Sequence, residues 1–157
     1  MKTKILMVCL GNICRSPLAE GVMKHLVSKI GQADFYHIDS AGTASYHIGD
    51  LPDSRSRQVA LNHGHQLVHK GRQFTRDDFK NFDHILVMDK SNLANILKLA
   101  KTDEEKNKVR IITDYDPRPN HPEIVPDPYY GDINDFEAVY QQLVYCCEGF
   151  LSKQQKL

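Results

Sequence analysis

The sequence predicts an α/β fold in which a parallel sheet carries helices on both faces. Apolar segments of strand length alternate along the chain with segments whose apolar residues recur at helical spacing. Strands that alternate with helices form parallel sheets, because each crossover helix returns the chain to the same end of the sheet. A chain of 157 residues suits one domain with one substantial core, so we treat residues 1–157 as a single domain.

The first strand and the first helix are predicted from the opening residues. Residues 4–10 (KILMVCL) form a nearly continuous apolar run, which is typical of a strand buried on both faces. Residues 16–31 carry apolar side chains at four-residue spacing and are predicted to form a helix. Ser16 is expected to cap its start, Pro17 suits its first turn, and Gly31 is expected to end it.

The remaining elements continue the same alternation. We expect a strand at 35–42, a helix at 54–64, a helical turn at 75–78, a strand at 83–89, a helix at 91–100, a strand at 108–113 and a last helix from about 134 to 151. The turn at 75–78 has Thr75 and Asp78 at capping-box spacing. Residues 114–133 are rich in proline and are predicted to be mostly loop.

Composition excludes several classes of function. Twenty basic and twenty acidic residues leave no net charge, which argues against a general nucleic-acid or membrane-surface binder. The chain has neither a secretory leader pattern nor an 18-residue apolar run, so a cytoplasmic protein without membrane association is expected. We also expect a monomer.

The four cysteines lie in two local pairs, Cys9 with Cys14 and Cys146 with Cys147. A secreted disulfide scaffold would spread them through a smaller chain. Histidines between residues 63 and 69 raise the question of zinc, but the cysteine spacing does not match that of structural zinc sites. We therefore expect no bound metal.

Residues 8–17, VCLGNICRSP, lead from the first strand into the first helix. Backbone N–H groups of such a loop and the positive end of the helix dipole favour an anion. Gly11 lets the backbone curl, and Arg15 can hold two phosphate oxygens in its planar fork. Cys9 at the base of this cradle is then a candidate nucleophile, with Ser16 placed to hydrogen bond its sulfur. The alternative is a buried strand cysteine and a surface arginine without chemical roles.

The segment VPDPYYGD, residues 125–132, is expected at the same edge of the sheet. Asp127 lies between two prolines and is a candidate acid that protonates a leaving oxygen. Tyr129 and Tyr130 follow it and are placed to wall an aromatic substrate. Taken alone, the Asp-Pro pair is equally compatible with an ordinary turn.

VCLGNICRSP, together with DSAGT at residues 39–43 and DPYYG at residues 127–131, resembles the low-molecular-weight protein tyrosine phosphatases. The resemblance covers nearly the whole chain. It implies a flavodoxin-like three-layer sandwich with a four-stranded parallel sheet, and a cysteinyl-phosphate mechanism without metal or other cofactor. It further implies that Cys9 is the nucleophile, Arg15 the phosphate clamp and Asp127 the general acid.

The same resemblance implies roles for residues around the cradle. His69 resembles a member of the polar network that holds the loop, although a surface position is also compatible with its context. Asp89 resembles an aspartate that supports the site, and by its place it is equally a candidate helix cap. The phosphate-binding and loop-supporting positions are then Leu10, Gly11, Asn12, Ile13, Cys14, Ser16, His69 and Asp89.

Substrate preference is expected to depend on a slot for an aromatic ring lined by Ile13, Tyr46, Tyr129 and Tyr130. The family often carries tryptophan or tyrosine in the loop at 43–53, and this chain has no tryptophan, so Tyr46 is the expected occupant. The expected substrates are phosphotyrosine-bearing proteins or small aryl phosphates, with inorganic phosphate as product. Cys14 is expected to form a reversible disulfide with Cys9 under peroxide, and a packing role is its alternative.

Four alternative functions remain at this point, and one of them, a redox sensor, is compatible with phosphatase activity in the same protein. A phosphoarginine phosphatase of the same fold typically has threonine where this loop has Ile13. An arsenate reductase relays electrons through further cysteines, whereas Cys146 and Cys147 fit the buried face of the last helix. A phosphotyrosine-binding module without catalysis would keep the cradle but need not keep Asp127.

Overall fold

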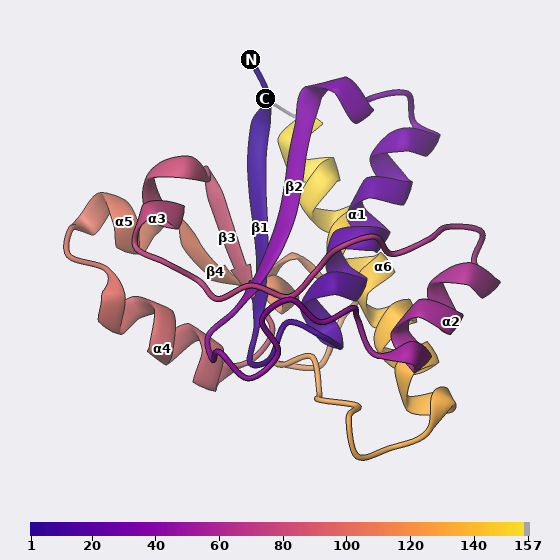
Figure 1. Cartoon of the computed structure of the whole chain (residues 1–157). Helices are drawn as coiled ribbons and strands as arrows, with labels where there is room; N and C mark the ends of the chain where they lie inside the picture. The colour runs from indigo at the N-terminus through magenta and orange to yellow at the C-terminus, as the bar shows by residue number, and fades with distance from the viewer. Residues whose placement is uncertain (156–157) are drawn as a thin grey trace.

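Four parallel strands form the centre of the computed structural model, which describes residues 1–155 (Figure 1). The strands are β1 (Thr3–Cys9), β2 (Tyr36–Gly42), β3 (His84–Val87) and β4 (Val109–Ile111), and they lie in the order β2-β1-β3-β4. The register of β1 with β2 runs from Thr3↔Tyr36 to Cys9↔Gly42. The predicted four-stranded parallel sheet is therefore confirmed.

Helices cover both faces of the sheet, which confirms the three-layer architecture. Side chains of α1, α2 and α6 share a core with Ile5 and Met7 of β1 on one face. Leu6 and Val8 point to the other face, where they pack with residues of α3 and α4. Figure 1 shows the two helical layers on opposite sides of the strands. The helix bounds are α1 Arg15–Lys29, α2 Ser54–Asn62, α3 Asp77–Asn81, α4 Lys90–Leu99, α5 Asp103–Asn107 and α6 Ile133–Gln155.

The start of α1 differs from the prediction. The helix begins at Arg15 with Cys14 as its N-cap, so Ser16 is not the cap. The hydroxyl of Ser16 instead turns inward and lies 3.0 Å from the Cys9 sulfur. Pro17 does lie in the first turn. Gly31 follows the helix at φ 72°, and the N–H of Gln32 donates to the Val27 carbonyl, so the predicted stop is confirmed.

Several element boundaries also differ from the prediction. α5 was not predicted; it is five residues long and has no buried residue, so it leaves no apolar pattern in the sequence. β4 ends at Ile111 because the chain then turns into the 3₁₀ helix η2 (Ile112–Tyr115). The 3₁₀ helix η1 (Ala33–Phe35) takes the first residue of the predicted second strand. The last helix continues beyond its predicted end, to Gln155.

The topology brings the ends of the strands together at one edge of the sheet. β1 lies between β2 and β3, so Cys9, Gly42 and Val87 end side by side. The strand order reverses at β1, and ligands bind at such switch points. The loops that follow these strands meet there, and the proline-rich segment between η2 and α6 runs along the same edge (Figure 1). Within residues 1–155, no helix is both long enough and apolar enough to cross a membrane.

Candidate active site

Cys9 is the last residue of β1 and lies at the base of the candidate site. Only 2% of its surface is exposed. Its sulfur and the Ser16 hydroxyl are 3.0 Å apart, so the two groups share a hydrogen bond. Ser16 can therefore stabilise negative charge on this sulfur by donating to it.

The loop after Cys9 turns its carbonyl groups outward. The carbonyls of Cys9 and Leu10 accept from the N–H groups of Thr43 and Ala44, at 2.9 Å each, and the Ile13 carbonyl accepts from Asp53 at 2.8 Å. In the described part of the chain, the N–H groups of residues 11–14 have no protein acceptor. These N–H groups and the N-terminus of α1 together form an environment that favours an anion.

Asn12 fixes the shape of this loop. Its backbone has φ 58°, the left-handed conformation, which asparagine tolerates better than most residues. Its side-chain Nδ2 donates to the hydroxyls of Ser16 (2.8 Å) and Ser40 (3.0 Å). Ser40 in turn donates to the buried carboxylate of Glu20 at 2.6 Å. A continuous polar chain thus runs from Glu20 to Cys9.

His69 completes the support of Asn12. Its Nε2 lies 2.7 Å from the Asn12 Oδ1, and its Nδ1 lies 3.3 Å from carboxylate oxygens of both Glu20 and Asp39. Burial alone would raise the pKa of Asp39, but hydrogen bonds from His69 and the Ser40 N–H, with the charge of Arg72, hold it well below its usual value. His69 therefore belongs to the network rather than to the open surface.

The same cluster contains side chains of the types that bind metal ions. Ligand atoms of Glu20, Asp39 and His69 lie within 4.8 Å of one another. Each is already engaged by protein partners: Ser40 and Lys24 bind Glu20, Arg72 binds Asp39, and Asn12 binds His69. These contacts account for the cluster as part of the loop support.

Arg15 projects from the start of α1 and is 3% exposed. Its Nη1 donates to Asp89 at 2.7 Å and to the Val125 carbonyl at 3.0 Å. Asp89 also caps α4, because its other oxygen accepts from the Asn92 N–H at 2.8 Å. Asp89 was a candidate both for site support and for a helix cap. One of its oxygens contacts Arg15 and the other caps α4, so both contacts are present.

Asp127 lies on the proline-rich segment and lines the same cavity as residues of the loop after Cys9. Its side chain is 43% exposed, and one of its oxygens is 3.9 Å from Arg15 Nη2. Its other oxygen accepts from the Tyr129 N–H at 3.1 Å. The structure thus brings Arg15 and Asp127 to the same edge as Cys9, although the two lie far apart in the sequence.

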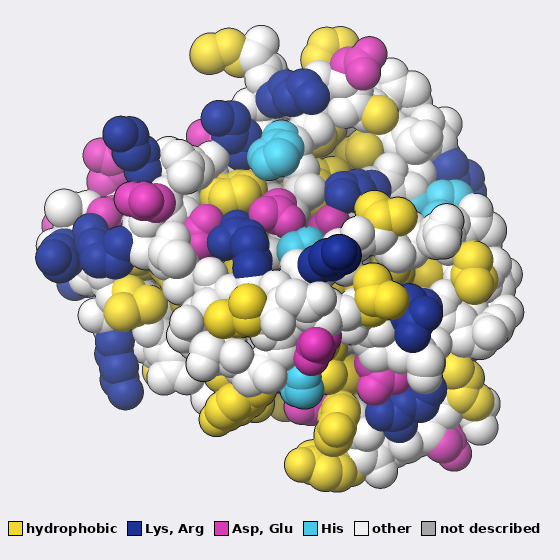
Figure 2. Space-filling view, viewed as in Figure 1, with side chains coloured by type: hydrophobic (Ala, Val, Ile, Leu, Met, Phe, Trp, Pro, Cys, Tyr) yellow, Lys and Arg dark blue, Asp and Glu magenta, His cyan; other side chains and the backbone are white. Residues whose placement is uncertain are grey.

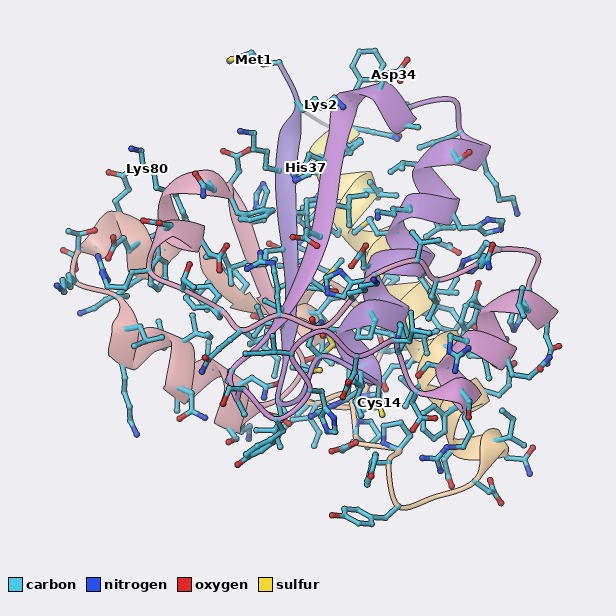
Figure 3. All side chains as sticks on the ribbon, viewed as in Figure 1. Met1, Lys2, Cys14, Asp34, His37 and Lys80 are labelled. Carbon is cyan, nitrogen blue, oxygen red and sulfur yellow. The ribbon has the colours of Figure 1, made fainter. Side chains whose placement is uncertain are left out.

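A cavity of about 290 Å³ opens at this edge. All four residues predicted to form an aromatic slot line it, together with part of the loop and Asp127. Figure 3 places Cys14 here, at the start of α1, and Figure 2 shows hydrophobic side chains projecting from the same lower edge. The lining residues are Leu10, Gly11, Ile13, Cys14, Tyr46, His47, Asp127, Tyr129 and Tyr130.

The tyrosines at the mouth of the cavity are accessible. Tyr130 is 94% exposed and Tyr46 75% exposed, so a ligand can cover both. Tyr129 meets Tyr130 edge to face, with ring centroids 5.0 Å apart. The three tyrosine rings therefore form an aromatic rim at the mouth of the cavity.

The other cysteines differ in environment. Cys14 is 5% exposed, and burial, followed by the charges of Asp53 and Cys9, raises its pKa. Cys146 and Cys147 lie on the buried face of α6, in the hydrophobic core, as predicted. Burial raises the pKa of Cys146 to about 12. Neither α6 thiol is therefore available as a reactive thiolate.

Sequence reasoning missed part of the supporting network, namely Glu20, Ser40 and Arg72. Two signals were present. Glu20 lies one helical turn after Ser16, on the same face, and Ser40 lies within the DSAGT segment. Neither signal shows that a helix carboxylate will be buried, because burial depends on the tertiary partners that neutralise it.

Comparison with known proteins identifies relatives over the full length. Residues 4–157 match the family model described as low molecular weight phosphotyrosine protein phosphatase. A rat protein of that name is 46% identical over 95% of this chain and 94% of its own length. The crystal structure of a protein tyrosine phosphatase from Entamoeba histolytica superposes with a TM-score of 0.94 at 40% identity, covering 99% and 98% of the two chains. The crystal structure of a drosophila arginine phosphatase superposes with a TM-score of 0.89 at 38% identity, covering 98% of each chain.

Proposed function

Because the chain belongs to the low molecular weight phosphotyrosine protein phosphatase family, we propose that it hydrolyses phosphotyrosine and small aryl phosphates through a cysteinyl-phosphate intermediate. One observation carries the proposal. The Cys9 sulfur lies beside the Ser16 hydroxyl at the base of a loop whose N–H groups at residues 11–14 have no acceptor within residues 1–155. A phosphate group held by these N–H groups and Arg15 presents its phosphorus to that sulfur.

In the first step the Cys9 thiolate attacks phosphorus, and the bond from phosphorus to the aryl oxygen breaks. Asp127 donates its proton to the departing oxygen, which leaves as a neutral phenol. In the second step water attacks the phosphocysteine, and the Asp127 carboxylate accepts its proton. The sulfur–phosphorus bond breaks, Ser16 stabilises the returning thiolate, and inorganic phosphate leaves.

Preference for an aromatic substrate is supported by the walls of the cavity. Ile13 and the three tyrosines line a space large enough for one ring above the cradle. We infer that Tyr130, the most exposed of these residues, covers the outer face of the ring. Replacing it by alanine should lower aryl over alkyl selectivity by the ~0.5–1.5 kcal/mol of one aromatic contact.

A second candidate substrate is phosphoarginine. The similarity to a drosophila arginine phosphatase motivates testing it. Ile13 supports the aryl preference instead, because it packs partly buried against the core and lends the cavity an apolar wall. Arsenate reduction is less compatible, since the remaining two cysteines are core residues.

The proposal further holds that the enzyme acts as a monomer in the cytoplasm, where its substrate is a phosphotyrosine-bearing protein or an aryl phosphate. The even balance of charge supports independent diffusion rather than attachment to polyanions. Sedimentation at several protein concentrations tests the monomer, and a concentration-dependent shift in mass contradicts it.

The decisive experiment compares the native protein with Cys9→Ser. The native protein should hydrolyse p-nitrophenyl phosphate and a phosphotyrosine peptide faster than phosphoarginine, and it should not reduce arsenate. Cys9→Ser should lose turnover while still binding vanadate, because the cradle is intact. Cys146→Ala, a cysteine change outside the cavity, serves as the control and should remain active. A Cys9→Ser enzyme that kept a tenth of the native rate would contradict the assignment.

A further inference from the structure

Arg55, in the first turn of α2, reaches across to the segment that carries Asp127. Its Nη1 donates to the Gly131 carbonyl at 2.9 Å, and its Nη2 donates to the Tyr129 carbonyl at 3.0 Å. One planar guanidinium thus holds two carbonyls on either side of Tyr130. Within residues 1–155, these are the only hydrogen bonds that reach segment 127–131 from elsewhere in the chain.

The guanidinium is itself fixed by its neighbours. Nε and Nη2 of Arg55 donate to the two carboxylate oxygens of Asp53, both at 3.0 Å. The planar group also lies over the Phe136 ring, 4.3 Å from its centroid. Burial would raise the pKa of Asp53, but the hydrogen bonds from Arg55 outweigh it and lower that pKa. The pair is therefore charged at neutral pH, and its geometry is constrained on three sides.

These contacts connect the two halves of the active site. The N–H of Asp53 donates to the Ile13 carbonyl in the phosphate loop at 2.8 Å. At the other end, Tyr129, whose carbonyl Arg55 holds, donates its N–H to Asp127 at 3.1 Å. The path Ile13–Asp53–Arg55–Tyr129–Asp127 thus sets the general acid relative to the cradle.

We propose that Arg55 is a positioning residue for the phosphatase reaction: it holds the acid-bearing segment where Asp127 reaches the oxygen that leaves phosphorus. The inference rests on the proposed function. Asp127 requires such positioning because it is partly exposed and, among residues 1–155, Arg15 at 3.9 Å is its only close cationic neighbour. A misplacement of about 1 Å costs a reacting group as much as ~10²-fold in rate.

A purely structural role for Arg55 predicts a different pattern of loss. If Arg55 only stabilised the fold, replacing it would lower activity equally for all substrates, because it would reduce the folded fraction or change the shape of the cavity. A positioning residue would lower kcat/KM most where the leaving oxygen most needs its proton. The dependence of kcat/KM on the leaving group therefore separates the two roles.

The test uses Arg55→Met, which retains a stem to pack on Phe136 but removes every donor. We expect kcat/KM for phenyl phosphate to fall about 10-fold more than for p-nitrophenyl phosphate, within the ~10²–10⁴-fold that a positioned acid supplies. Arg55→Lys should recover only part of the loss, because one ammonium cannot hold both carbonyls in the same fork. Vanadate affinity should stay within about 2-fold of native, since the cradle keeps its N–H groups.

Arg118→Met is the matched control. Arg118 likewise pairs with an aspartate, Asp116, at 2.7 Å and lies over an aromatic ring, Tyr145, at 4.2 Å. It makes no hydrogen bond to segment 127–131. Arg118→Met should leave the ratio of the two substrates unchanged.

Two outcomes overturn the inference. One is an equal loss of kcat/KM across leaving groups in Arg55→Met, or in Arg55→Lys if the methionine variant does not fold. The other is a selective loss of the same size in an Asp127→Ala background, where no acid remains to be positioned. Both results presuppose a native enzyme that depends on Cys9. If Cys9→Ser keeps its activity, the proposed function fails instead.

Discussion

Asn12 shows how much a single residue contributes to the shape of the loop after Cys9. It takes the left-handed backbone conformation, and its side-chain amide binds two hydroxyls, His69 and the Arg72 N–H. The first property needs asparagine or glycine, whereas the second needs an amide. The two contributions can be separated by substitution.

Asn12→Gly and Asn12→Ala should therefore differ in stability. Both lose the buried amide contacts, which costs about 1–3 kcal/mol for the partners left unsatisfied. Alanine also pays ~1–2 kcal/mol for the left-handed backbone, whereas glycine does not. In urea unfolding, the native protein should be the most stable, Asn12→Gly less stable, and Asn12→Ala the least stable. Equal midpoints for the two variants would mean that the backbone relaxes without strain.

Cys14 is predicted to react after Cys9 when peroxide oxidises the protein. Its raised pKa keeps it a thiol at neutral pH. Peroxide should therefore convert the Cys9 thiolate to a sulfenic acid, and Cys14 then displaces water to form the disulfide. Closure should accelerate as pH rises, because the Cys14 thiolate becomes more populated.

Mass mapping after a peroxide pulse at pH 7 and pH 9 checks this order. Cys14→Ser should accumulate irreversible sulfinic or sulfonic acid at Cys9, and bound phosphate should protect both proteins. If a thiol reductant restores Cys14→Ser as fully as the native enzyme, Cys14 is a packing residue only.

At the residue scale, the sequence predicts the groups that would contact phosphate but not most of the groups behind them. Cys9 and Arg15 are adjacent to one strand end, so spacing alone places them together. Glu20 belongs to the same network, yet carboxylates on helices are usually exposed. Its burial depends on Ser40 and Lys24, which come from another strand and the next helical turn.

Among the elements, α6 depends on a close approach to η2. Gly149 lies on the face of α6 that meets η2, and a methyl group there would collide with the Tyr115 carbonyl. Tyr115 and Phe150 pack edge to face beside it, with centroids 5.0 Å apart. The last helix therefore cannot move outward without breaking an aromatic contact.

Gly149→Ala should lower the free energy of unfolding by about 1–3 kcal/mol, the usual cost of overpacking. Thermal unfolding followed by circular dichroism measures the change, and Glu148→Ala, at an exposed neighbouring position, is the control. Activity per folded molecule should stay native, because Gly149 is not among the residues that line the cavity. An unchanged melting temperature would show that η2 shifts freely.

Element boundaries were less predictable than element types. Strands with continuous apolar runs and helices with a buried stripe appear in the sequence, whereas α5 buries nothing and leaves no pattern. Ser16 illustrates a competing contact. Its hydroxyl would suit a cap, but the Cys9 sulfur and the Asn12 amide bind it instead. Local propensity gives way where a tertiary partner offers a better bond.

At the scale of the whole molecule, a cluster of histidines joins three parts of the fold. His65 stacks on His25 of α1 at 4.5 Å, and its Nε2 lies 2.8 Å from the Tyr140 hydroxyl of α6. His63 stacks on the same Tyr140 ring and pairs with Glu137. Burial, with the charges of His25 and His63, lowers the pKa of His65 to about 4.

This cluster predicts a loss of stability in mild acid. The unfolded chain protonates His65 near pH 6.5, whereas the folded protein resists until about pH 4. Stability should therefore fall as pH drops through this window, by about 1–2 kcal/mol after allowance for solvent screening. Urea unfolding between pH 7 and pH 4.5 measures it. His65→Gln should flatten the dependence, and a variant as acid-sensitive as the native protein would rule out this cause.

The parallel sheet also separates the cavity from the opposite end of the molecule. Thr3 pairs with Tyr36 at the far end of β1 from Cys9, and Gln155 in the last turn of α6 donates to Gln32 near that same end (Figure 1). A tether joined before β1 or through the end of α6 would therefore leave the mouth facing solution. The protein can therefore be attached to a bead or sensor surface with its cavity accessible, without changing residues at the cavity edge of the sheet.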